Sequence, residues 1–210
     1  MPSLDSATPA LLVLAVAAVG VFHTLVPDHW VPIALVARKQ GWTRAQTARA
    51  AAIAGLGHTV STLIIAIVVW YAGVVFAERF GRDVDIVTSV LLFGFGAWVV
   101  FGAVRELRES PHAHTHTQPT SSRTALLLIV GSSPMVEGIP AFFAASRYGI
   151  ALIAVMSIVF AVSTIATYVG LCVASASGLQ RMSFGPLERY GEVLSGAIIM
   201  ALGIVFIFLR

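Results

Sequence analysis

Apolar residues follow one another along this chain in six long runs, and the polar and charged residues gather between them. The runs cover residues 9–27, 50–77, 84–104, 124–146, 148–176 and 191–209. Each run is close to or longer than the roughly 20 residues that an α-helix needs to cross a bilayer, and the longer runs allow tilt or protruding ends. The pattern predicts an all-α integral membrane protein with six transmembrane helices.

A proline-flanked stretch separates the first run from a short apolar tract at residues 31–37, which is too short to cross a membrane alone. Pro27 and Pro32 bracket this stretch. Proline lacks a backbone N–H and clashes with the preceding helical turn, so we expect the first helix to be broken here. Such breaks occur inside membranes where protein covers the freed backbone groups.

The second half of the chain repeats features of the first half. At an offset of 102 residues the matching positions are Val-Ser-Thr at 60–62 and 162–164, Leu92 and Leu194, and Gly94 and Gly196. The proline pairs Pro27/Pro32 and Pro134/Pro140 also correspond, each bracketing an acidic residue. A three-span repeat inverts its orientation the second time, as in many transporters. We expect two inverted three-helix repeats, residues 1–109 and 124–210, each with a broken first helix; chance similarity is the alternative.

Composition excludes a soluble domain. Of the 210 residues 58% are hydrophobic and only 11% are charged, against roughly 25% charged in soluble proteins. Membrane lipid is therefore an expected partner, and nucleic acid is not. Cys172 is the only cysteine, which excludes an intramolecular disulfide, a redox pair and a thiolate metal cage.

The basic residues predict an orientation. One side of the predicted membrane collects nine of the 13 Lys and Arg residues: Arg38, Lys39, Arg44, Arg49, Arg105, Arg108, Arg123, Arg181 and Arg189. Because cytoplasmic loops are enriched in Lys and Arg, this side is expected to be cytoplasmic. We therefore predict a multi-pass protein of the cytoplasmic (inner) membrane with both termini outside the cytoplasm.

The densest polar cluster lies at the end of the first run, where His23, Asp28 and His29 form the pattern H-x4-D-H. On an unbroken helix residues 23 and 29 would lie about 120° apart, so the three side chains would not face one point. A break at Pro27 lets the Asp28-His29 pair turn toward His23 and frees backbone carbonyls as further oxygen ligands.

His58, in the second run, adds a fourth candidate at a similar depth in the membrane. Imidazoles and a carboxylate suit borderline divalent ions such as Ni²⁺, Co²⁺ and Zn²⁺, whereas Mg²⁺ and Ca²⁺ prefer oxygen cages. The alternative is that His58 is a hydrogen-bonded structural residue, as a lone histidine in an apolar helix usually is.

The fourth run contains Glu137 and, before it, Ser133-Pro134. This dipeptide has the form of an N-cap followed by proline at the first helical position, which predicts a half-helix beginning inside the membrane. Glu137 would then complete the site or relay protons, unless it only pins the helix or faces water.

Three alternate histidines, His112, His114 and His116, lie in the predicted cytoplasmic loop at residues 110–123. In an extended segment their imidazoles project to one side, which favours a loose accessory metal trap. A solvated linker is the alternative.

The stretches HTLVPDHWVP, GLGHTVSTL and GSSPMVEGIP resemble the nickel/cobalt permease superfamily, including its urease-accessory and NicO-type branches. The resemblance covers the six-span length. It implies metal selection by His23, Asp28, His29 and His58, and a His-rich cytoplasmic loop is familiar from efflux members. The better-known uptake permeases are longer and carry the signature in the second span.

We therefore expect a non-enzymatic secondary permease for a divalent metal ion, Ni²⁺ or Co²⁺, with no resident cofactor. Because imidazole must be neutral to bind metal, protons should compete with the ion. The chain contains no nucleotide-binding motif, so transport is secondary or driven by a separate partner subunit; a homo-oligomer is also open. The alternatives are a small-anion exporter using half-helix dipoles and an intramembrane zinc hydrolase.

Overall fold

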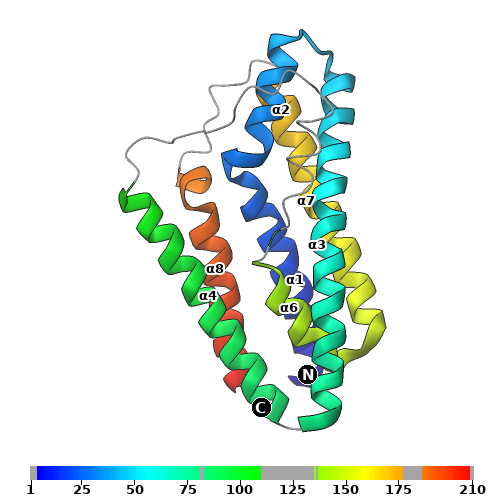
Figure 1. Cartoon of the computed structure of the whole chain (residues 1–210), viewed down its shortest axis with the longest axis vertical. Coiled ribbons are helices and arrows are strands. Elements are labelled where there is room, and N and C mark those ends of the chain that lie inside the picture. The colour runs from blue at the N-terminus through cyan, green and yellow to red at the C-terminus, as the bar shows by residue number, and fades with distance from the viewer. Residues whose placement is uncertain (1–3, 81–82, 110–134, 136, 177–185, 209–210) are drawn as a thin grey trace.

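The computed structural model describes residues 4–80, 83–109, 135, 137–176 and 186–208. These residues form a bundle of α-helices and contain no β-strand (Figure 1). The long helices are α1 (Leu4–Leu25), α3 (Arg44–Phe80), α4 (Asp83–Glu109), α7 (Gly149–Ala176) and α8 (Pro186–Phe208). The shorter ones are α2 (Pro27–Lys39), α6 (Ile139–Ala144) and the 3₁₀ helix η1 (Ala145–Tyr148). The all-α prediction is confirmed for this part of the chain.

Five helical segments of the described residues are long and apolar enough to cross a membrane. They are Thr8–Leu25, Arg44–Arg79, Ile86–Arg105, Ile139–Ala176 and Tyr190–Phe208. Large apolar side chains such as Phe101, Ile150 and Phe208 point outward from the bundle, as a lipid-facing surface requires. The chain is thus a multi-pass membrane protein by length and composition. Most of the predicted fourth span, residues 124–134 and 136, lies outside the described residues.

The predicted break in the first helix is confirmed at Pro27. Helix α1 ends at Leu25, and Val26 adopts an extended conformation with φ −62° and ψ 131° before α2 begins with Pro27 in its first turn. Proline forces the preceding residue out of the helical region, which explains why the break falls at Val26. Pro32, by contrast, lies inside α2, so the second proline does not end the helix.

The predicted half-helix of the second half begins later than expected. Met135 is not helical, Glu137 and Gly138 form a turn, and α6 starts at Ile139 with Gly138 as its N-cap and Pro140 in its first turn. The first-turn proline is therefore Pro140 and not Pro134, which itself lies outside the described residues. Glu137 consequently precedes the short helix instead of lying within it.

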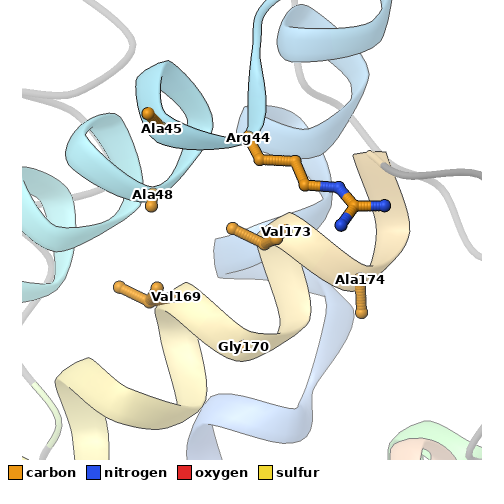
Figure 2. A pocket seen from close by; sticks show the side chains of 7 residues that line it. All are labelled: Arg44, Ala45, Ala48, Val169, Gly170, Val173 and Ala174. Atoms are coloured by element: carbon orange, nitrogen blue, oxygen red, sulfur yellow. The ribbon is translucent and has the colours of Figure 1, made fainter.

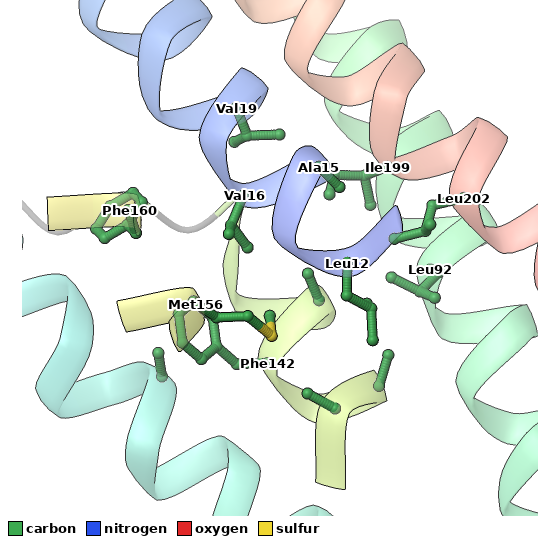
Figure 3. Close-up of a cluster of buried hydrophobic side chains, with 14 of the residues drawn as sticks. Leu12, Ala15, Val16, Val19, Leu92, Phe142, Met156, Phe160, Ile199 and Leu202 are labelled. Carbon is green, nitrogen blue, oxygen red and sulfur yellow. The ribbon is translucent and has the colours of Figure 1, made fainter. Parts of the chain in front are cut away.

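Helix α1 runs through the middle of the bundle and carries much of the core. Its residues Leu12, Val16 and Val19 are fully buried and belong to one hydrophobic cluster with side chains of four other helices (Figure 3). Those partners are Phe142 of α6, Met156 and Phe160 of α7, Ile199 and Leu202 of α8, and Leu92 of α4. This packing fixes the broken end of α1 relative to both halves of the chain.

Helices α4 and α8 lie side by side and approach each other closely through glycines (Figure 1). A Cβ atom added to Gly96 would lie 2.4 Å from the backbone nitrogen of Met200 and 2.7 Å from the carbonyl oxygen of Gly196. Small residues allow such close approach of helices in membranes. Gly94 lies two residues earlier, and a Cβ atom added there would have no other atom within 4 Å.

Replacing Gly96 with Ala should therefore destabilise the protein. The added methyl group meets backbone and not a flexible side chain, so α4 and α8 must separate, at a cost of about 1–3 kcal/mol. Thermal unfolding in detergent measures the loss. Gly94→Ala is the matched control and should leave the unfolding temperature unchanged or slightly higher; equal effects of the two substitutions would contradict the close α4–α8 packing.

Candidate metal and proton site at the helix break

Two histidines from different helices stack against each other in the core. His23 lies in the last turn of α1, just before the break at Val26, and His58 lies within α3. Their ring centroids are 5.6 Å apart and the ring planes differ by 17°. His23 is 7% exposed and His58 is fully buried. The structure thus brings these two residues together, as their similar predicted depth required, and we call them the imidazole pair.

A carboxylate lies beside the imidazole pair. Glu137, in the turn before α6, is 8% exposed, and its Oε1 is 3.4 Å from Nδ1 of His23. An acidic side chain within a span is costly and normally faces a partner, a cavity or a bound ion. The contact with His23 supplies such a partner, and it joins the two halves of the chain at the site.

Thr62 holds the turn that carries Glu137. Its hydroxyl donates a hydrogen bond to the carbonyl oxygen of His58 at 2.9 Å and accepts one from the backbone N–H of Met135 at 2.9 Å. Thr62 lies one helical turn after His58, so α3 presents both the imidazole and the anchor on one face. The same hydroxyl therefore satisfies a non-helical backbone group and positions the chain next to Glu137.

Further buried polar side chains lie on α3 and α7, the helices that carry His58 and Tyr168. Tyr168 of α7 is fully buried, and its ring centroid lies 6.1 Å from that of His58. The hydroxyls of Thr59 and Thr164 are buried without a hydrogen-bond partner among the described residues, so they are available as oxygen donors to a water or an ion.

Two glycines let α7 approach α1 and α3 closely at this cluster. A Cβ atom on Gly20 of α1 would lie 2.9 Å from Oγ1 of Thr164, and one on Gly55 of α3 would lie 3.4 Å from Tyr168. Larger residues at these two positions would push α7 away from α1 and α3. The glycines therefore bring the polar residues of α7 to the imidazole pair.

Sequence reasoning missed Tyr168 as a neighbour of His58 and Thr59 as a buried polar residue. A signal was present for Tyr168, because it lies four residues after Thr164 and hence on the same helical face. Thr59 directly follows His58. Whether its side chain faces the core depends on how α3 packs, which the sequence alone does not give.

The other predicted site residues are placed only in part. Asp28 and His29 lie in the first turn of α2, directly after the break, but their side chains are outside those that the structure describes. Ser133 and the loop histidines His112, His114 and His116 also lie outside the described residues. Among the described side chains, no three His, Cys, Asp or Glu residues converge closely enough to hold a metal ion together.

Comparisons of the chain with protein-family models, with curated proteins and with solved structures found no match. The resemblance to nickel/cobalt permeases therefore stays a prediction from the sequence.

The role of Thr62 is tested by removing its hydroxyl. Thr62→Val leaves the Met135 N–H without its acceptor, which should destabilise the protein by about 1–3 kcal/mol, whereas Thr62→Ser keeps the bridge. Ser61→Ala is the matched control, because the Ser61 hydroxyl donates to the same His58 carbonyl at 2.9 Å. Thermal unfolding of the three variants should rank Thr62→Val as the least stable; a larger loss in Ser61→Ala would contradict the anchoring role.

Proposed function

We propose that the chain is a secondary transporter that moves a divalent transition-metal ion, Ni²⁺ or Co²⁺, through the membrane by way of the imidazole pair. The observation that carries the proposal is the burial of His23 and His58 against each other, with Glu137 in contact, in the middle of an apolar helical bundle. Ionisable groups inside membrane spans are costly and mark ion and proton pathways.

The spacing of the imidazole pair suits a shared ion. Metal–nitrogen bonds of about 2.0–2.1 Å place two imidazoles on one ion when their centroids lie within about 6.5 Å, and the observed separation is 5.6 Å. The nearly parallel rings need a side-chain rotation before both present a nitrogen to the ion. Asp28 and His29, in the first turn of α2 directly after the break, are the proposed additional ligands. Ser133 and the loop histidines have at most an accessory role.

Glu137 gives the proposal a route for protons. Protonated His23 pairs favourably with a carboxylate at 3.4 Å, whereas metal binding requires neutral imidazole. An arriving ion would therefore displace a proton from the pair, and loss of the ion would restore it. We propose proton–metal exchange on this basis.

The pattern of helix contacts supports two inverted repeats. Under exchange of the halves, α1 corresponds to α6, α3 to α7, and α4 to α8. The contacts of α1 with α7 and α8 are matched by contacts of α6 with α3 and α4, and corresponding helices also touch each other. Interrupted helices at the repeat interface are where transporters bind their substrates, and both Val26 and Glu137 lie at such interruptions.

The proposed setting is the cytoplasmic membrane with the α2–α3 turn on the cytoplasmic side. The chain acts alone, as a homo-oligomer or with a partner subunit, and the site is proposed to lie within one copy because His23, His58 and Glu137 come from the same chain.

Metal flux into proteoliposomes tests the proposal. Wild-type protein should carry Ni²⁺ or Co²⁺, faster with an opposing proton gradient. His23→Ala and His58→Ala should each lower the flux by more than the roughly 10–100-fold that loss of an outer-sphere partner costs. Leu56→Ala is the control, because Leu56 precedes His58 by two residues on α3 but is 54% exposed.

The same assay separates the alternatives. Normal metal flux in both histidine variants, with folded and inserted protein, would refute the site. Metal-independent flux of a small anion would favour an anion exporter, and hydrolysis of a lipid or amide by the purified protein would favour a zinc hydrolase.

A further inference from the structure

An open groove lies between the beginning of α3 and the end of α7, away from the imidazole pair. Its volume is about 630 Å³, within the range of roughly 300–1,000 Å³ typical of small-molecule sites. The walls are small or apolar and come from both helices (Figure 2): Ala45 and Ala48 of α3, and Val169, Gly170, Val173 and Ala174 of α7. Arg44 is the only charged residue of the described lining.

Arg44 extends over the mouth of the groove. Figure 2 shows its side chain reaching from the start of α3 across the last turns of α7, past Val173 toward Ala174. Arg44 is exposed, and no ion pair of Arg44 with a carboxylate is present within the part of the chain that the structure describes. The guanidinium is therefore placed to bind an anion that lies above an apolar channel.

The charged residues near Arg44 in the sequence are all basic. Arg38, Lys39 and Arg49 are exposed near it in sequence, and residues 38–49 contain no Asp or Glu. Arg44 precedes the apolar run at residues 50–77 by six residues, about 9 Å along a helix, so we infer that it lies near the level of the lipid headgroups. The neighbouring Trp42 agrees with this depth, because Trp is enriched at membrane–water interfaces.

Gly170 leaves space open on the α7 side of the groove. A Cβ atom added there would meet no other atom within 4 Å, so the space beside α7 is open. An acyl chain fits such a channel, since it needs only apolar walls and a lateral opening to the lipid.

We propose that this groove binds one anionic glycerophospholipid, with its phosphate on Arg44 and an acyl chain against Ala48, Gly170 and Val173. The ligand matches the site in both charge and polarity, and basic pockets between transmembrane helices on the cytoplasmic side are known to take such headgroups. A bound lipid here would hold the ends of α3 and α7 together. The proposal does not depend on metal transport.

Native mass spectrometry of the full-length protein tests it, with phosphatidylglycerol and phosphatidylcholine titrated separately. Wild-type protein should retain one phosphatidylglycerol in preference to phosphatidylcholine. Arg44→Gln should lower the affinity for phosphatidylglycerol about fivefold, the factor expected for one basic residue near a lipid surface, and abolish the preference. Arg38→Gln, which removes an equal charge outside the groove lining, should lower the affinity less than Arg44→Gln does.

Gly170→Leu tests the apolar half of the site. The new side chain enters open space, so the protein should remain folded, but it should occupy the channel and lower retention of both lipids. Gly94→Leu is the matched control, because Gly94 also has open space around it and lies on α4. The proposal is overturned if Arg38→Gln weakens binding as much as Arg44→Gln, if Gly170→Leu has no effect, or if wild-type protein shows no preference for the anionic lipid.

Discussion

A membrane interior tolerates non-helical backbone only where protein groups satisfy its hydrogen-bonding atoms, and the architecture of this site depends on how that requirement is met. The chain leaves the helical conformation at Val26, at Met135 and in the turn at Glu137 and Gly138. At Met135 the hydroxyl of Thr62 accepts the backbone N–H. At the other break the N–H of Val26 bonds to the carbonyl of His23 at 3.1 Å. Thr62 lies one helical turn from His58, and His23 belongs to the imidazole pair. Groups at the site therefore satisfy the backbone at both breaks.

The two helix breaks also have an electrostatic consequence. The two breaks bring a histidine from the first half and a glutamate from the second half to 3.4 Å, in surroundings where neither group has bulk water. Burying one such group alone would be strongly unfavourable, so His23 and Glu137 stabilise each other's presence. In the proposed function a metal ion and a proton would compete for the same imidazole nitrogen, which would make the site sensitive to protons. Fold and proposed chemistry therefore rest on the same contact.

The local features of the chain could be predicted from its sequence, whereas most long-range contacts could not. Apolar runs predicted where the helices lie, and Pro27 predicted the break, because both effects act within a few residues. The pairing of His23 with His58 followed from their equal depth. The hydrogen bond from Met135 to Thr62 joins residues 73 positions apart, and no local pattern predicts it. The start of α6 at Ile139 was mispredicted for the same reason. Ser133-Pro134 and Gly138-Ile139-Pro140 both place a proline where the first turn of a helix can lie. The helix that begins at Ile139 packs against α3 and α4.

The proposed function requires that His23 and His58 bind the same ion. X-ray absorption fine structure at the nickel K-edge, on full-length protein loaded with one equivalent of Ni²⁺, measures how many imidazoles coordinate it. We expect scattering from at least two imidazoles in the wild-type protein and the loss of one imidazole in each of His23→Ala and His58→Ala. Tightly bound Ni²⁺ whose spectrum is the same in wild type and in both variants would contradict it.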